Sequence, residues 1–262
     1  MVRYHHLVVG MGAEKMPSFH GIFLRRLPRP LIYLTLNLFS SPCHLQLAAK
    51  RYAHYWEKRV EICGPEKAFQ PLTLATDGPL HDDGDTALAI GFLNYVEGPA
   101  DAAGRGVLVV FPGHQDRTQY TRPAMARAAW YIIHALLDSS PTVQKHGLLF
   151  LAHPHGAKFG QFDRALMKIM LGSIQGALPV RLSAFHICQP PPFFKIILPI
   201  AKLFMTERTK KRLNVHFGSP AEICHKLTNT FGMHKECIPE ALGGTLTIDM
   251  AAWVAQRRAE GK

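Results

Sequence analysis

The sequence contains no apolar stretch long enough to cross a lipid bilayer as a helix. Such a helix needs about 20 apolar residues, and the strongest apolar runs, residues 31–39 and 193–205, are shorter. The apolar run at residues 7–11 is also too short for the core of a secretory signal. We therefore expect a soluble protein that stays inside the cell.

Cysteine is scarce and follows no pairing pattern. The scattered cysteines include no C-x-x-C pair, and they are Cys43, Cys63, Cys188, Cys224 and Cys237. An odd number of scattered cysteines suits reduced thiols better than a disulfide framework. This usage predicts a cytoplasmic location.

Signatures of common enzyme classes are also missing. There is no phosphate-binding G-x-x-x-x-G-K-[ST] loop. There is no G-x-S-x-G nucleophile elbow either, because the serine in residues 172–176 directly follows the first glycine and lies at a helix end. We therefore predict a protein that is not an enzyme and needs no cofactor.

Positive charge is in excess, with 30 Lys and Arg against 19 Asp and Glu and a formal net charge of +11. Such an excess favours an anionic partner, either a nucleic acid, an acidic membrane surface or a phosphorylated ligand. No ribonucleoprotein motif, zinc finger or helix-turn-helix pattern is found, so we expect no nucleic-acid partner.

From residue 104 onward, short apolar runs alternate with helical patterns. The apolar runs predict buried strands at residues 107–111, 148–152, 182–188 and 215–217. The helical patterns between them cover residues 122–137, 162–174 and 193–205. Apolar strands separated by helices predict an α/β fold, with a mixed, mostly parallel sheet flanked by helices.

A further amphipathic helix is expected upstream, over residues 45–62. Its apolar positions include Tyr55 and Val60, and Gly64 ends it. Charged residues occupy the opposite side of this helix, and they are Lys50, Arg51, Lys58 and Arg59. Residues 1–22 are mixed in composition and are expected to form a poorly ordered tail.

Residues 193–205 form the most apolar helix of the chain. The charged residues in it, Lys195 and Lys202, share one face, and Pro199 lies inside it. A helix that is apolar on most sides is either buried in a core or faces an apolar ligand or lipid. A proline inside it favours a kink or a break. The alternatives are therefore a core helix and a movable lid over a hydrophobic cavity.

A basic cluster follows this helix directly. Arg208, Lys211 and Arg212 have the spacing of one helical face. Each Lys or Arg near an anionic bilayer adds roughly 1 kcal/mol of attraction. An apolar helix followed by a basic face therefore favours docking on an anionic membrane over a merely solvated surface.

Residues 179–244 carry motifs of a known family. Residues 179–190 read PVRLSAFHICQP, close to an arginine strand that runs into H-I-I-N-x-P. Residues 238–244 read IPEALGG, close to L-P-x-E-Y-G-G. Residues 202–205 read KLFM, similar to K-P-F-L, and residues 215–218 read VHFG, similar to I-x-x-H-G. With these four motifs, residues 179–244 resemble the CRAL-TRIO lipid-binding family.

The resemblance implies a hydrophobic pocket over the sheet and a gate helix that swings at the membrane. The gate residues are then Phe193, Phe194, Ile197, Leu198, Ala201 and Phe204. Candidate pocket-lining residues are Tyr120, Trp130, Tyr131, Phe150, Phe185 and Ile187. The implied function is binding and intermembrane transfer or presentation of a phospholipid, phosphoinositide, tocopherol or retinoid by a monomer that associates with membranes peripherally.

The headgroup residues also follow from the resemblance. Arg181, Arg208 and Arg212 fall on the pattern of a phosphoinositide-reading cluster, and Lys211 lies beside them. Thr209 matches a threonine that binds inositol phosphate in the phosphatidylinositol-transfer branch. Val180 stands where that branch has a glutamate, which argues against its phosphatidylinositol site.

The domain organisation is expected to be atypical at the N-terminus. Residues 1–46 are interpreted as an irregular extension, 47–70 as a remnant of the family's helical N-terminal subdomain, 71–250 as the lipid-binding domain and 251–262 as a C-terminal helix or tail. Residues 27–44 interrupt the family pattern, either as a genuine insertion or as a gene-model artefact.

A metal-dependent hydrolase is the alternative function. His153 and His155 follow one predicted strand, and His114 and Asp116 follow the preceding one. The ends of neighbouring parallel strands are where α/β sites tend to form, and histidine and aspartate are metal ligands.

Overall fold

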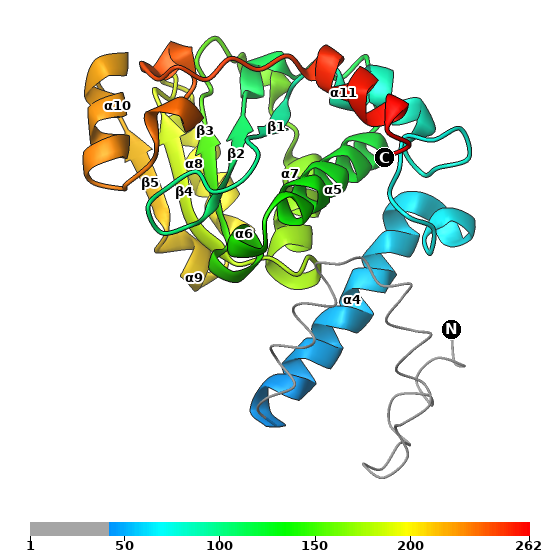
Figure 1. Ribbon diagram of the computed structural model, residues 1–262. Helices are drawn as coiled ribbons and strands as arrows, with labels where there is room; N and C mark the ends of the chain where they lie inside the picture. Colours follow the sequence, from blue (N-terminus) through cyan, green and yellow to red (C-terminus); the bar gives the residue numbers. More distant parts are fainter. Residues whose placement is uncertain (1–41) are drawn as a thin grey trace.

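The computed structural model describes residues 42–262 (Figure 1). The predicted N-terminal tail lies outside the described residues. The segment 27–44, interpreted as a genuine insertion or a gene-model artefact, also lies outside them, except for residues 42–44, which begin a helix. Among the described residues, no helix is both long and apolar enough to cross a membrane.

A single five-stranded sheet is described, with strand order β1-β2-β3-β4-β5. Its strands are β1 (Leu93–Tyr95), β2 (Gly106–Val110), β3 (Leu148–Ala152), β4 (Leu182–Cys188) and β5 (Leu213–His216). β1 pairs antiparallel with β2, and the remaining neighbours are parallel. The prediction of a mixed, mostly parallel α/β sheet is confirmed, although β1 was not expected from the sequence.

Helices surround the sheet and connect its strands. The longer ones are α4 (Pro42–Lys67), α5 (Arg122–Ser139), α7 (Arg164–Gly172), α8 (Phe194–Leu203), α10 (Pro220–Asn229) and α11 (Met250–Ala259). Shorter segments include α6 (Pro141–His146), α9 (Glu207–Lys210), η1 (His81–Asp83), η2 (Gly84–Leu88) and η5 (Ser173–Ala177). The remaining single turns are η3 (Pro112–His114), η4 (Phe159–Gln161), η6 (Lys235–Cys237) and η7 (Glu240–Leu242).

The two faces of the sheet belong to two separate hydrophobic clusters. Leu108 and Phe150 pack in one cluster with α5 and α7, whereas Val109 and Leu151 pack in the other with Ile223 of α10. Strand order that follows chain order, combined with right-handed crossovers, places the crossover helices on the same face. α5, α7 and α8 therefore share one face of the sheet (Figure 1).

The helix predicted at residues 45–62 is present as part of α4, and it packs across α5. Tyr55 is fully buried, with its ring 5.1 Å from that of Trp130. Gly64 interrupts the helix in a left-handed, non-helical conformation (φ 77°), where glycine is tolerated without steric cost. The predicted end of the first helical segment is therefore confirmed.

The predicted polar side of α4 is wrong at one position. Arg59 is 1% exposed, whereas Val60, which was expected on the apolar side, is 37% exposed. The Arg59 guanidinium donates to the Tyr55 hydroxyl and to the backbone carbonyl of Gln70, and it lies over the Trp56 ring. Arginine can be buried in this way because its apolar stem packs while its fork finds acceptors.

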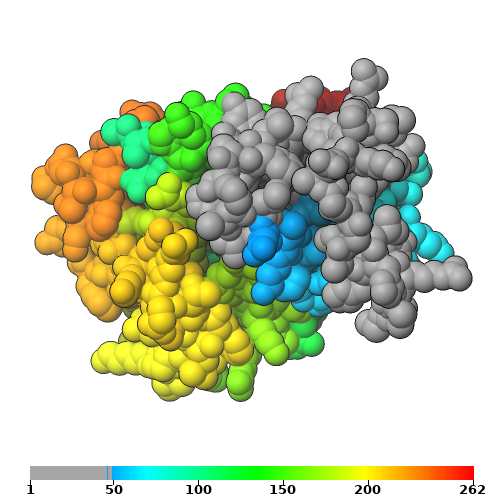
Figure 2. Space-filling view, turned by 90° about the horizontal axis from the view of Figure 1, so that it is seen from below, coloured from blue at the N-terminus to red at the C-terminus, as the bar shows by residue number. Residues whose placement is uncertain are grey.

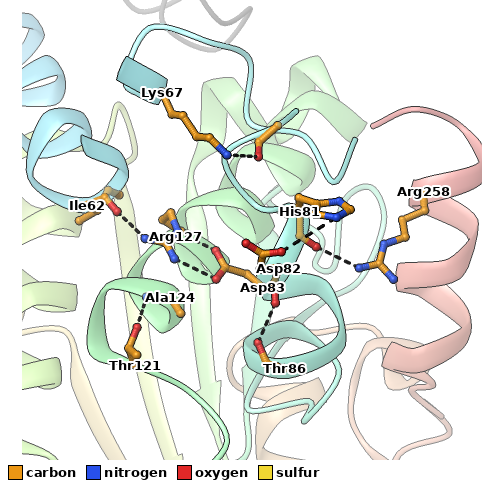
Figure 3. Close-up of polar contacts among 11 residues, drawn as sticks. Ile62, Lys67, His81, Asp82, Asp83, Thr86, Thr121, Ala124, Arg127 and Arg258 are labelled. Atoms are coloured by element: carbon orange, nitrogen blue, oxygen red, sulfur yellow. Dashed lines mark hydrogen bonds and ion pairs between the residues drawn. The ribbon is translucent and has the colours of Figure 1, made fainter. Parts of the chain in front are cut away.

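A buried ion pair joins α4, η1 and α5 (Figure 3). Arg127 of α5 donates from Nε and Nη2 to both carboxylate oxygens of Asp83, at 2.6 and 2.9 Å. Its Nη1 donates to the backbone carbonyl of Ile62 at 2.7 Å. The Asp83 side chain is 4% exposed, and Arg127 is its ion-pair partner.

We expect Asp83→Asn to lower the free energy of unfolding by about 3 kcal/mol, because removing one partner leaves the other as an uncompensated, largely buried charge. The matched control is Asp82→Asn, since the neighbouring Asp82 side chain is 93% exposed. Urea denaturation followed by circular dichroism measures both. Equal stability of the two variants would contradict this role of the pair.

Candidate functional site

An apolar cavity of about 180 Å³ lies between the sheet and the helices α7 and α8. Its floor consists of side chains from the inner sheet face: Val110, Phe150, Ala152, Phe185 and Ile187. One wall comes from α7 and η5: Leu166, Met167, Met170, Leu171 and Ile174. The cover comes from α8 and its flanks: Phe193, Phe194, Ile197, Leu198, Ala201 and Met205.

α8 is apolar both toward the cavity and toward solvent. Ile197 and Ala201 are buried against the cavity, at 5% and 6% exposure. On the opposite side Ile196 is 59% and Leu203 is 73% exposed. A core helix would bury both sides, so this arrangement excludes the fully buried alternative. Of the expected kink or break at Pro199, a break does not occur, because the helix continues through this exposed residue.

The expected gate residues divide into two groups. Phe193, Phe194, Ile197, Leu198 and Ala201 line the cavity. Phe204, the C-cap of α8, does not line it. Its ring instead lies 5.5 Å from the guanidinium carbon of Arg164 on α7.

The expected pocket-lining residues divide in the same way. Phe150 and Phe185 stack at 5.4 Å in the cavity floor, and Ile187 lies in the same floor. Tyr120, Trp130 and Tyr131 do not line this cavity. For Trp130 and Tyr131 the reason is that the inner face of α5 meets neighbouring helices instead. Trp130 packs against Tyr55 of α4, and the Tyr131 hydroxyl accepts a hydrogen bond from Arg257 of α11.

Tyr120 packs beside the main core just before α5 and does not reach the cavity. Residues of α7 that do reach it, above all Met167 and Met170, were not selected from the sequence. Their spacing with Leu166 on one face of the predicted helix is the signal that identifies them.

Three expected headgroup arginines come together at the amino end of β4. Arg212 donates from Nη1 to the backbone carbonyl of Leu182, while Arg181 and Arg208 are exposed. The pKa of Arg212 is lowered, first by partial burial and then by the positive charges of Arg208 and Arg181. These charges are therefore close enough to interact. Lys211 is exposed beside them, and we call these four residues the basic cluster.

Thr209 does not belong to this surface. It is 4% exposed, and its hydroxyl donates to Gln175 Oε1 at 2.9 Å and contacts the Thr206 hydroxyl, the N-cap of α9, at 3.0 Å. In this structure the Thr209 side chain is therefore enclosed and already paired, apart from the exposed arginines with which it was grouped.

Gln175 of η5 holds the junction between α8 and α9. Its amide nitrogen donates to the backbone carbonyls of Leu171 and Phe204, and its Oε1 accepts from the Thr206 backbone at 2.6 Å. The Gln175 backbone carbonyl also accepts from Arg51 of α4 at 3.1 Å. Figure 2 shows α4 in blue against the yellow-green surface of the chain around η5.

We expect Gln175→Leu to loosen the end of α8, because it leaves the buried Thr209 hydroxyl without its acceptor at a cost of about 1–3 kcal/mol. Faster amide exchange in the peptide covering residues 203–210, measured by mass spectrometry, would show this. Gln256→Leu on the exposed side of α11 is the control and should leave the exchange unchanged. Equal exchange in both variants would contradict the role of Gln175.

The four residues considered for a metal are engaged in other contacts. His153 Nε2 lies 3.1 Å from Gln189 Oε1, and His114 Nδ1 lies 3.2 Å from the Gly91 carbonyl oxygen. Asp116 accepts from Thr118 and Gln119, and His155 stacks on His153 at 5.6 Å. Within residues 42–262 no group of three or more His, Cys, Asp or Glu side chains could hold a metal ion. The hydrolase alternative therefore finds no support.

The protein is an α/β protein with a covered cavity. An apolar cavity lies on one face of its mixed sheet, and the covering helix α8 has a second apolar side that is exposed. Residues 91–244 match the family model of the CRAL/TRIO domain, and this span contains the cavity, α8 and the basic cluster. The chain therefore belongs to the CRAL/TRIO family. The resemblance found in residues 179–244 is confirmed.

Relatives support this membership. Clavesin-2 of Rattus norvegicus is 26% identical over 210 residues, which cover 79% of this chain and 59% of that protein. Tyrosine-protein phosphatase non-receptor type 9 of Rattus norvegicus is 30% identical over 127 residues, which cover 48% of this chain and 20% of that protein. The chain thus matches about three fifths of the length of Clavesin-2.

Among solved structures, the crystal structure of Sfh5 aligns with a TM-score of 0.48 at 13% sequence identity. The alignment covers 89% of this chain and 83% of that one.

Proposed function

We propose that this protein binds a lipid without catalysis and transfers or presents it at anionic membranes. The observation that carries the proposal is the apolar cavity covered by α8, whose outer side exposes Ile196 and Leu203. Membership of the CRAL/TRIO family supports lipid binding as the class of function. The lipid would occupy the space between the sheet floor and α8.

The cavity supplies the driving force for extraction. Each CH₂ group of a lipid chain removed from water contributes about 0.8 kcal/mol. The cavity described here is smaller than the roughly 300–1,000 Å³ of typical ligand pockets. Loading a lipid therefore requires α8 to move outward, which is the motion expected of a gate.

Contact with a membrane would favour this motion. Ile196, Leu203 and Phe159 expose apolar surface on the cover side, and Phe159 packs edge-on against Phe193 at 5.9 Å. Inserting such side chains into the bilayer interface is favourable, and nearby basic residues add attraction to anionic lipids. Three residues of the basic cluster, Arg208, Lys211 and Arg212, follow α8 closely in the chain, so apolar and electrostatic contacts would act together.

A cavity test is Met170→Trp, which adds bulk to the α7 wall without changing the sheet. Overpacking costs about 1–3 kcal/mol, so lipid affinity should fall roughly 5- to 150-fold. Native mass spectrometry of protein loaded from phosphatidylcholine vesicles measures the bound fraction. Ile196→Trp, on the outer side of α8, is the control and should keep its lipid. Full loading of both variants would exclude the cavity as the lipid site.

A gate test is the pair Ile196→Asp and Leu203→Asp, which removes apolar surface without touching the cavity. Transfer of fluorescent lipid between vesicles should slow at least about tenfold, because charged groups oppose insertion, while already bound lipid stays bound. Phe217→Asp is the control, since Phe217 is 75% exposed but lies after β5.

The same assay tests membrane charge. Arg208→Gln with Lys211→Gln should remove the preference of transfer for anionic over neutral vesicles. Equal transfer to both kinds of vesicle by the parent protein would refute the electrostatic part of the proposal, and unchanged transfer by the two-aspartate variant would refute the gate.

A further inference from the structure

A second cavity, open to solvent and about 520 Å³ in volume, lies beside the apolar one. Phe162 and Asp163 line both cavities, so the two are adjacent. Four cationic side chains line the second cavity, and they are Arg117, Arg122, Arg164 and Lys168. We call it the cationic cavity. None of its cations belongs to the basic cluster.

Among the residues that line the cationic cavity, Asp163 is the one carboxylate, and both of its oxygens already accept hydrogen bonds. Its Oδ2 accepts from Arg122 Nε at 2.8 Å and lies 3.7 Å from Arg117 Nε. Its Oδ1 caps α7 by accepting from the backbone N–H groups of Ala165 and Leu166, both at 3.0 Å.

The charge state of Asp163 reflects these contacts. Burial alone would raise the pKa of Asp163, but the Leu166 amide, the Arg122 hydrogen bond and the nearby positive charges outweigh burial and lower it. Asp163 therefore stays ionised. It balances the charge of only one of the four cations.

Arg164 and Lys168 have no such partner. They stand four residues apart on one side of α7, where like charges repel. Within residues 42–262, no carboxylate lies within 4.0 Å of either charge. Arg164 is held instead against the ring of Phe204, which lines the cationic cavity and caps α8.

We propose that the cationic cavity binds a phosphoryl group. Arginine forks match phosphate oxygens in geometry, and lysine adds a point charge. Three positive charges remain after Asp163 is counted, so a dianionic phosphate matches the cavity better than a single carboxylate. The group is either the headgroup of a lipid whose chains occupy the adjacent apolar cavity or part of a free phosphorylated molecule. The lipid source rests on the function proposed above.

An occupant of the cationic cavity also contacts the cover of the apolar one. Phe204 is the last residue associated with α8, and it lines the cationic cavity. Arg164 contacts Phe204, so a phosphoryl group held by Arg164 would change how the end of α8 is held. Binding of a phosphoryl group in the cationic cavity would thus be coupled to the movement of α8 that lipid loading requires.

The first experiment uses a free phosphoryl ligand. Inorganic pyrophosphate is titrated into the full chain at low salt by calorimetry, and Arg164→Gln with Lys168→Gln should weaken binding at least about tenfold, since hydrogen bonds to charged groups contribute roughly 1.5–3 kcal/mol each. Both residues are exposed and lack ion-pair partners among the described residues, so the variant should fold; equal thermal unfolding temperatures check this.

Two charge-matched controls accompany this variant. Lys226→Gln with Lys235→Gln removes the same charge from exposed positions on and after α10 and should leave binding unchanged. Arg208→Gln with Lys211→Gln removes the same amount of positive charge from the basic cluster. Loss of pyrophosphate binding in the basic-cluster variant alone would overturn the proposal.

The second experiment uses lipids that differ only by a phosphate. The protein is incubated with phosphatidylcholine vesicles containing equal amounts of phosphatidic acid and diacylglycerol, isolated again, and its lipid identified by mass spectrometry. The parent should select phosphatidic acid, and the Arg164→Gln, Lys168→Gln variant should lose this selection while still taking up diacylglycerol.

The outcomes of the two experiments distinguish a lipid headgroup from a free phosphorylated molecule as the source of the phosphoryl group. Selection of phosphatidic acid, with or without pyrophosphate binding, identifies a lipid headgroup, whereas pyrophosphate binding without selection identifies a free phosphorylated molecule. No pyrophosphate binding and no selection overturn the cationic cavity as a phosphoryl site. Pyrophosphate binding with no lipid of any kind recovered leaves this site in place and rejects the proposed function.

Discussion

The connection of parallel strands in chain order is the constraint on which the candidate site depends. Because β2 to β5 lie side by side in sequence order, right-handed crossovers bring α5, α7 and α8 to the same sheet face. α5 fills its share of that face by packing against α4, as the contact of Trp130 with Tyr55 shows. α7 and α8 cover the remaining floor with an apolar cavity between them. The other face is closed by α10 and the segment after it.

The energetic balance at α8 follows from this geometry. The helix buries Ile197 and Ala201 but leaves Ile196 and Leu203 in water. Only part of its apolar surface is therefore buried in this position. Its end is retained by polar contacts from Gln175 and by Phe204 against Arg164. In the proposed function, a membrane or a bound lipid would compete with these contacts for α8. Cationic side chains lie on two sides of this end, in the basic cluster and in the cationic cavity, so anionic groups can approach it from both.

Much of the fold could be predicted from the sequence because it depends on local pattern. The strands β3 and β4 match the predicted strands residue for residue. β3 is buried at every position and apolar throughout, as a strand covered on both faces is expected to be. β1 escaped prediction because it has only three residues and pairs, antiparallel, with β2 at the edge of the sheet. The candidate site was predicted less well. Thr209 and Arg59 looked like surface residues by sequence position, yet both are enclosed by partners distant in the chain, Gln175 and Gln70.

The α/β class, the family motifs of residues 179–244 and the broad apolar character of α8 can be recognised without a structure, because they reside in consecutive side chains. Three other features depend on contacts between distant segments: which side of α8 meets the cavity, that α7 rather than α5 lines it, and that Asp163 joins Arg122 across 41 residues of chain. The cationic cavity likewise exists only where the start of α5, α7 and the end of α8 converge. The physical reason is that crossover packing, which brings distant segments together, is set by the shape of the whole sheet and not by any local pattern.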